Sequence, residues 1–234
     1  MSEEMLKDSW EPKGPVSRKI KERLQKAGKR FHSNDNIAEF IEDGEIDLLQ
    51  AEVQEKLQGV LDSLVIDTEN DHNTNETAKR VAKMYVNEIF WGLDYDAFPK
   101  ATVVENKMQY NEMVVEKGVS VQSYCEHHFV NIDGLATVAY VPNKKVLGLS
   151  KMNRIVEYFS RRPQIQERLT EQIYHALSFI LETENVAVMI DAKHFCVKSR
   201  GVEDTQCSTV TSRLGGIFKA HPEVRAEFLA LLKI

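Results

Sequence analysis

In the first part of the chain, apolar residues recur at the spacing of amphipathic helices. Between residues 46 and 64 they fall at every third or fourth position, which places them in one stripe on a helix surface. The same spacing recurs between residues 76 and 90, and a shorter version follows Pro15 in a stretch rich in lysine and arginine. Three helices are therefore predicted. The basic stretch around the first one is interpreted as a solvated helix or arm, with a contact to nucleic acid or to an acidic partner as the alternative.

After Pro99 the apolar residues fall in short continuous or alternating runs, which are typical of β-strands. An Asp133-Gly134 pair inside one of these runs predicts a hairpin turn. The Cys125-Glu126-His127-His128 stretch then lies at a strand junction, where the backbone can aim several side chains at one point. The predicted strands are 102–104, 113–115, 121–124, 129–141 and 186–190.

Helical spacing returns in the second half of the chain. Ser150 is expected to cap one helix, and Pro163 is expected near the start of a longer one. Residues 201–213 are polar and show no regular pattern. The helices predicted here are 150–160, 163–181 and 222–233.

Composition restricts the class of protein. The 234 residues, 42% hydrophobic and 28% charged, suit one large globular domain or one domain with an appended element. No apolar run approaches the roughly 20 residues needed to span a bilayer, and the N-terminus lacks the pattern of a secretory signal. Three cysteines do not suggest a disulfide framework, so we expect a cytoplasmic protein. The net charge of −6 argues against a general nucleic-acid binder and makes local basic clusters informative.

A candidate metal site comes from two separated stretches. Cys125 and His128 form a compact chelating pair, and Cys196 follows a distant strand-like run. Thiolates and imidazole are ligands that suit zinc, and three protein ligands with one position for water are typical of catalytic zinc sites. His127 and His194 are then candidate proton carriers beside the metal. The alternative is two buried thiols and some hydrogen-bonded histidines.

A second candidate site would bind an anion. Lys151 and Arg154 lie at a helix start, where two cations oppose the helix dipole unless an anion binds there. Lys198 and Arg200 are expected to alternate along an extended segment after Cys196. Together these charges suit a triphosphate.

Two further pairs have plain interpretations. Gln166 and Glu167 suit the first turn of a helix, although a carboxylate could also accept two hydrogen bonds from a guanine edge. Arg80 and Lys83 are neighbours on a helix surface and, taken alone, read as solvent-facing charges.

Most of the chain, residues 45–234, resembles GTP cyclohydrolase I. Four spaced motifs in the same order carry the resemblance, and the helix 77–93 with its Arg80-Val81-Ala82-Lys83-Met84 stretch also matches. The motifs are Cys125-Glu126-His127-His128-Phe129, Gly148-Leu149-Ser150-Lys151 with Arg154, Arg162-Pro163-Gln164 with Gln166-Glu167-Arg168-Leu169, and His194-Phe195-Cys196 with Arg200-Gly201.

The resemblance implies an enzyme that converts GTP and water to 7,8-dihydroneopterin triphosphate and formate, the first step of pterin and tetrahydrofolate biosynthesis. It implies a zinc ion that activates water for attack at C8 of the purine, and protons carried by His127 and His194. Glu167 and Gln166 would recognise guanine. The implied zinc ligands are Cys125, His128 and Cys196, and the implied triphosphate contacts are Ser150, Lys151, Arg154, Arg200, Arg80 and Lys83.

The resemblance also implies a fold and an assembly. The fold class expected is α+β, specifically the tunnelling fold, an antiparallel sheet with helices on one face whose subunit sheets close into a barrel. A homodecamer with shared active sites would remove exposed sheet edges. Three parts are expected: a polar and basic arm with a helix at 1–45, a helical region at 46–95 and the catalytic region at 96–234. The N-terminal arm lies outside the shared core, and Cys207 and Arg213 stand where small or hydroxyl residues are expected.

Three alternatives compete with this interpretation. A zinc-dependent base deaminase needs a His-x-Glu motif together with a Pro-Cys-x-x-Cys motif, and no Pro-Cys-x-x-Cys occurs in the chain. A non-catalytic zinc-stabilised assembly or nucleotide-binding module would need no spare histidine at the metal. A thiol-redox protein would be expected to carry Cys-x-x-Cys, which is absent.

Overall fold

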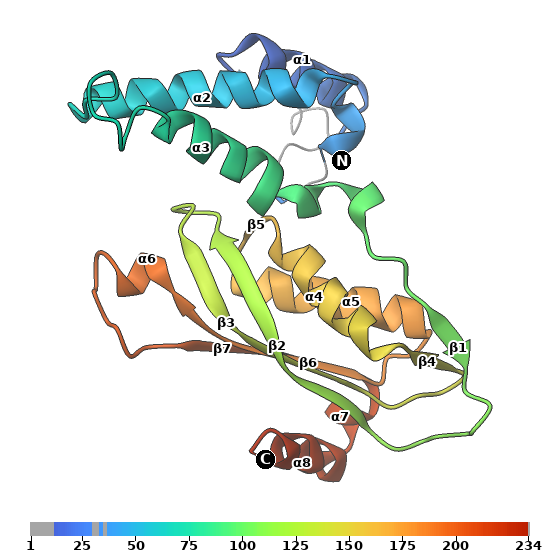
Figure 1. Cartoon of the computed structure of the whole chain (residues 1–234). Coiled ribbons are helices and arrows are strands. Elements are labelled where there is room, and N and C mark those ends of the chain that lie inside the picture. The colour runs from blue at the N-terminus through green and yellow to red at the C-terminus, as the bar shows by residue number, and fades with distance from the viewer. Residues whose placement is uncertain (1–11, 30–32, 35–36, 234) are drawn as a thin grey trace. The chain divides into compact units, whose positions relative to one another are not determined.

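The computed structural model describes residues 12–29, 33–34 and 37–233. The chain divides into two compact units, residues 1–96 and residues 97–234. Figure 1 shows a helical first unit and a second unit built around a sheet. None of the helices in the described part of the chain is long and apolar enough to cross a membrane.

The first unit contains the helices predicted from the apolar spacing. They are α1 (Pro15–Lys26), α2 (Glu45–Ser63) and α3 (Thr77–Lys83). α3 continues into a π-helical segment, η3 (Met84–Ile89), so the predicted helix 76–90 is present with a change of hydrogen-bond pattern. Short 3₁₀ turns complete the unit: η2 (Ala38–Phe40), η4 (Trp91–Leu93) and η5 (Tyr95–Ala97), the last of which ends at the first residue of the second unit.

Charged side chains of α2 and its N-terminal end hold α1. Glu52 accepts hydrogen bonds from the backbone N–H groups of Val16 (2.9 Å) and Ser17 (3.2 Å), so a neighbouring helix caps the start of α1. Arg23 forms a two-pronged pair with Glu45 at 2.5 and 2.6 Å. The Arg23 guanidinium lowers the pKa of Glu45 to about 2. The pair therefore stabilises the fold at pH values above the ordinary pKa of a glutamate, and this contribution is lost as the pH falls toward 2.

The second unit is organised by a five-stranded sheet with the order β5-β2-β3-β6-β7. All pairs are antiparallel except the short parallel contact between β5 and β2, so the predicted antiparallel sheet needs that correction. A separate two-stranded sheet joins β1 to β4. The strands are β1 (Val103–Glu105), β2 (Val114–Cys125), β3 (Asn131–Tyr140), β4 (Lys145–Leu147), β5 (Pro163–Gln164), β6 (Val186–His194) and β7 (Thr209–Leu214).

One long strand replaces the two short strands predicted at 113–115 and 121–124. The register of β2 against β3 shifts between Glu116 and Val119, and Gly118 has a positive φ of 70° there. Such a bulge lets the strand continue while it bends. The interruption at Gly118 is therefore a feature inside a strand rather than its end.

The predicted hairpin turn at Asp133-Gly134 is wrong. Both residues lie inside β3, and the chain reverses earlier, in the stretch that follows Cys125. Gly134 is needed for close packing, because a Cβ built on it would lie 2.2 Å from the carbonyl oxygen of Asp191 and 2.5 Å from the Cα of Ala192. A glycine in a strand can mark such a close approach rather than a turn.

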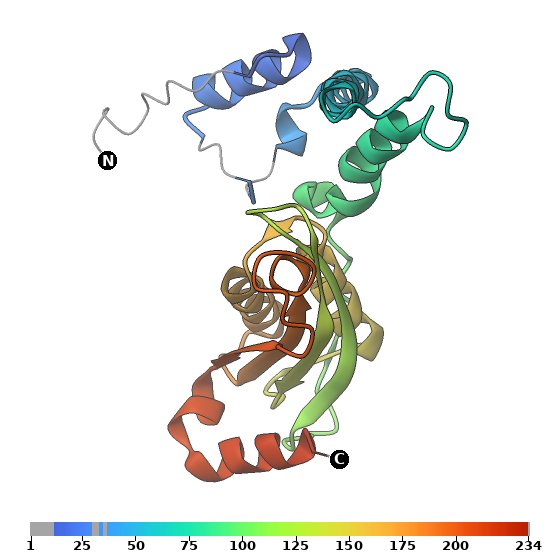
Figure 2. The same cartoon turned by 90° about the vertical axis from the view of Figure 1, so that its left-hand side faces the viewer.

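Helices cover both faces of the sheet. α4 (Leu149–Ser160) and α5 (Gln166–Leu181) pack on one face and form the main core with it. On the opposite face, Phe218 and Phe228 of α7 (Gly216–Ala220) and α8 (Pro222–Leu231) pack against Ala139 and Ala187. The prediction of helices on one face is therefore incomplete. Figure 2 shows the curled sheet with α8 at its lower end.

Four local predictions also change. Gly148 rather than Ser150 is the N-cap residue of α4. Pro163 belongs to β5, and α5 begins only at Gln166. The segment after β6 is the short helix α6 (Phe195–Lys198) rather than an extended run. Part of the stretch 201–213, which was predicted to be irregular, forms β7.

We predict that Gly134→Ala destabilises the second unit by about 1–3 kcal/mol, because the added methyl group must push two strand backbones apart. Urea unfolding followed by circular dichroism measures the loss, and hydrogen exchange of β3 and β6 amides locates it. Gly59→Ala is the control, since a Cβ there meets nothing within 4 Å. Unchanged exchange in β3 and β6 would contradict this account of Gly134.

Candidate metal centre

The metal-binding turn, residues Cys125 to Val130, connects β2 to β3. It is closed by the backbone hydrogen bonds Cys125 N–H to Val130 O (2.9 Å) and Phe129 N–H to Cys125 O (2.8 Å). Phe129 has a positive φ of 52°, an unusual conformation for a bulky residue. The turn is thus held in a shape that its own residues do not favour.

The pairing of β3 with β6 brings the second half of the centre to this turn. Ile132 lies opposite His194 in that pairing, and Cys196 follows two residues later in α6. The candidate ligand atoms of Cys125, His128 and Cys196 all lie within 4.8 Å of one another. The structure therefore gathers the three residues that the sequence predicted as metal ligands.

The surroundings of the two thiols suit a cation. Cys125 is buried, Cys196 is half-buried and His128 is exposed. Burial raises the pKa of Cys196, and the nearby Cys125 raises it further, while the charge of Arg200 lowers it. Beside a divalent metal both thiols would ionise, because the metal stabilises thiolates. The donor chemistry therefore fits a thiophilic ion such as zinc.

The two additional histidines have different surroundings. The Nδ1 atom of His127 is 3.7 Å from the sulfur of Cys125. His194 is positioned differently, because its Nε2 atom lies 2.7 Å from Oε1 of Gln166. The burial of His194 lowers its pKa, and the negative charge of Glu167 partly opposes this.

Gln166 is buried, and its side chain is hydrogen-bonded to other residues of the chain. Its Nε2 atom donates to the carbonyl oxygens of Thr209 (2.8 Å) and Ile190 (3.1 Å), and it is 3.1 Å from the hydroxyl of Thr211. Carbonyl oxygens only accept, so the amide orientation is fixed and Oε1 must accept from His194. His194 therefore carries a proton on Nε2.

Arg200 contacts one of the candidate ligands from the loop after α6. Its guanidinium donates to Nε2 of His128 at 2.9 Å, so this nitrogen is the acceptor in the contact. Lys198 makes a different contact, because its ammonium group lies over the ring of Phe195. Of the two cations predicted to approach the metal site, the structure places Arg200 beside the candidate ligand His128.

The other predicted substrate contacts lie on helices. Ser150, Lys151 and Arg154 occupy the first turns of α4, whose first turn contains no acidic residue. Glu167 is exposed in the first turn of α5.

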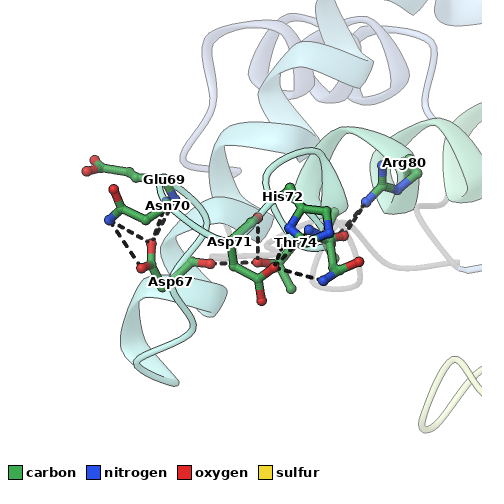
Figure 3. A network of polar contacts seen from close by, with 9 residues as sticks. Asp67, Glu69, Asn70, Asp71, His72, Thr74 and Arg80 are labelled. Atoms are coloured by element: carbon green, nitrogen blue, oxygen red, sulfur yellow. Dashed lines mark hydrogen bonds and ion pairs between the residues drawn. The ribbon is translucent and has the colours of Figure 1, made fainter.

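Arg80 and Lys83 belong to α3 in the first unit. Arg80 donates to the carbonyl oxygen of Asn73 at 3.0 Å and pairs with Glu76 at 3.7 Å, while Lys83 pairs with Glu88 at 3.5 Å. Figure 3 shows Arg80 at the end of the hydrogen-bond network of the preceding Asn-rich loop.

Sequence reasoning missed one ion pair at the centre. Glu126, inside the metal-binding turn, pairs with Arg168 of α5 at 2.6 and 3.2 Å. The only signal in the sequence is a cation at a helix start, where it opposes the dipole and therefore needs a negative partner.

Two thiols and an imidazole gathered at one end of a curled sheet make this a protein of mixed helix and sheet with a candidate metal site. Three donors are the number typical of catalytic zinc sites. A family model described as GTP cyclohydrolase I matches residues 53–233. The chain belongs to the GTP cyclohydrolase I family.

Curated relatives agree with this assignment. A protein named GTP cyclohydrolase 1 from Aeromonas hydrophila subsp. hydrophila is 57% identical over 184 residues, which cover 77% of this chain and 84% of the relative. The protein of the same name from Shewanella denitrificans is 57% identical over 181 residues, covering 77% of this chain and 83% of the relative. A Shewanella sp. protein, also of that name, is 60% identical over 160 residues, covering 68% and 74%.

We predict that Cys196→Ala weakens zinc binding by more than about 100-fold, because outer-shell partners alone contribute about 10–100-fold. Competition with a chromogenic chelator measures the affinity. His127→Ala should keep zinc, and the exposed Cys207→Ala serves as the thiol control. Stoichiometric zinc in purified Cys196→Ala would remove Cys196 from the ligand set.

Proposed function

We propose that this chain hydrolyses and rearranges GTP to 7,8-dihydroneopterin triphosphate and formate, the GTP cyclohydrolase I reaction that begins pterin and tetrahydrofolate biosynthesis. The observation that carries the proposal is the convergence of Cys125, His128 and Cys196 beside two histidines, in a chain of this family.

Zinc is the proposed cofactor, held by Cys125, His128 and Cys196. Their mixed thiol and imidazole chemistry supports zinc over magnesium or calcium, which prefer oxygen ligands. When bound, zinc would act as a Lewis acid that lowers the pKa of water at the reacting carbon. Since Arg200 contacts Nε2 of His128, metal binding must use Nδ1 of that ring or displace the guanidinium.

The histidines are the proposed proton carriers. Opening the imidazole ring of the purine requires protons to be delivered to nitrogen and removed from oxygen. His194 holds a proton on Nε2 toward Gln166, which leaves Nδ1 as its basic atom, and burial favours this neutral form. His127, exposed beside Cys125, can exchange protons with the reacting groups.

The substrate would be positioned by its two polar ends. Lys151, Ser150 and Arg154 combine cations, a hydroxyl and helix N–H groups at the start of α4, which favours a triphosphate. Arg200 would contribute from the loop after α6. For Arg80 and Lys83 of α3, a contact to the triphosphate stays a prediction that rests on the family resemblance. At the other end, the exposed carboxylate of Glu167 would accept hydrogen bonds from guanine. The buried contacts of Gln166 support a role behind Glu167, in which Gln166 holds His194.

The tunnelling fold and the homodecamer are also proposals. In the described part of the chain β7 pairs only with β6, so its outer edge presents backbone groups that a neighbouring subunit could pair with. Closing several curled sheets into one barrel would satisfy these edges. The division at residues 45 and 95 and a cytoplasmic location likewise remain predictions.

The proposed reaction is tested with zinc-loaded protein and GTP, following formate and dihydroneopterin triphosphate together. We expect both products, loss of activity with a chelator and recovery with added zinc. His127→Ala should reduce kcat by about 10²–10⁴-fold while retaining zinc, as expected for a lost acid–base group. Bound zinc and bound GTP without turnover would favour a non-catalytic nucleotide-binding module instead.

We predict that Glu167→Ala lowers kcat/KM for GTP by at least about 100-fold, since each hydrogen bond to a charged group contributes about 1.5–3 kcal/mol. Inosine triphosphate, which lacks the exocyclic amino group, provides the comparison. The wild type should prefer GTP strongly, and the variant should lose this preference. A variant that still discriminates against inosine triphosphate would exclude Glu167 as the guanine-recognising residue.

A further inference from the structure

We infer that Glu126 and Arg168 are positioning residues, a clamp that fixes the metal-binding turn against the first turn of α5. The inference rests on the proposed function, because it assigns the clamp the task of holding the metal ligands and Glu167 in one geometry. Neither residue is proposed to touch the metal or the substrate.

The contact geometry is that of a strong pair. The two terminal nitrogens of Arg168 donate to the two carboxylate oxygens of Glu126, at 2.6 and 3.2 Å. Such two-pronged pairing fixes direction as well as distance. The Glu126 side chain is 17% exposed and that of Arg168 is 34% exposed, so the pair is partly shielded from water. It therefore differs from the fully solvated ion pairs that contribute little.

Both partners have neighbours that belong to the site. Glu126 lies between Cys125 and His127 in the metal-binding turn, and Arg168 follows Glu167 directly on α5. The backbone supports the same contact, because Glu126 N–H donates to the carbonyl oxygen of Gln164 at 3.0 Å. The clamp thus connects the proposed metal ligands to the proposed guanine-binding residue by a short covalent path on each side.

Two costs explain why the turn and the helix each need this contact. Phe129 has a positive φ of 52°, and a bulky residue in this conformation persists only when its surroundings hold it there. Arg168 is the third residue of α5, where a cation opposes the helix dipole. The Glu126 carboxylate neutralises the charge of Arg168 at the helix start. By holding the turn, it also helps to keep Phe129 in its unfavourable conformation.

The test measures zinc affinity and kinetics in Glu126→Gln, Arg168→Met and the double variant. Zinc affinity is measured by chelator competition without GTP, so its outcome does not depend on whether the proposed reaction occurs. We expect each single variant to lose about 10-fold or more in zinc affinity and in kcat, as removal of outer-shell partners commonly does. The double variant should lose no more than either single variant, because one interaction is removed in all three.

Arg168→Lys and Glu171→Gln complete the set. Lysine keeps the charge but not the two-pronged contact, so its losses should lie between wild type and Arg168→Met. Glu171 lies on the same helix and pairs with Arg213 at 3.2 Å and with His175 at 3.4 Å, so Glu171→Gln removes more exposed ion pairs away from the turn. We expect it to leave zinc affinity unchanged.

Three outcomes would overturn the inference. Zinc affinity and kcat within twofold of wild type in both single variants would show that the clamp positions nothing. Losses that add in the double variant would show two independent effects. A raised KM for GTP with unchanged zinc affinity and kcat would make Arg168 a substrate-binding residue. If Arg168→Met fails to fold, Arg168→Lys and Glu126→Gln give the same comparison.

Discussion

The candidate centre depends on the register between β3 and β6. That antiparallel pairing places Ile132 opposite His194, and because β3 begins just after the metal-binding turn, Cys196 arrives beside Cys125 and His128. Register is fixed wherever one face of a strand is buried, since a slip of one residue would exchange its buried and exposed side chains. The main core on the α4 and α5 side enforces this register, so packing far from the candidate ligands sets the distances between them.

The sequence was sufficient to predict which three candidate ligands lie together, but not the residues that support them. Cys125 and His128 are close in sequence, and Cys196 ends a strand-like run. Their side chains are typical metal ligands and their positions are at the ends of predicted strands, so both signals indicated the same three residues. The hydrogen bond from His194 to Gln166, by contrast, joins the end of a strand to the start of a helix, and no local sequence pattern predicts it. The family resemblance implied that Gln166 contacts the substrate. Its burial and its hydrogen bonds to Ile190 and Thr209 could be found only in three dimensions.

Three errors in the fold prediction have a common origin in glycine and proline. Asp133-Gly134 predicts a turn by local preference, but the approach of Asp191 and Ala192 makes glycine necessary inside a strand. Gly118 marks a bulge within β2 rather than its end, and Pro163 forms a strand contact before α5 begins. Glycine and proline are favoured both at turns and at sites of close packing or irregularity inside strands. The sequence alone therefore cannot distinguish a turn from such a site.

The starts of α4 and α5 use charge in opposite ways. On α5, Arg168 opposes the helix dipole but is neutralised by Glu126 of the metal-binding turn, so this helix start is already balanced within the chain. On α4, the first turn holds Lys151 and contains no acidic residue, and Arg154 follows on the next turn. Because cations at a helix start are unfavourable without a counter-charge, α4 gains stability when a polyanion binds, whereas α5 does not need one. This asymmetry supports the proposal that the phosphates bind at α4 and that Glu167 of α5 presents its carboxylate to an uncharged, hydrogen-bonding group.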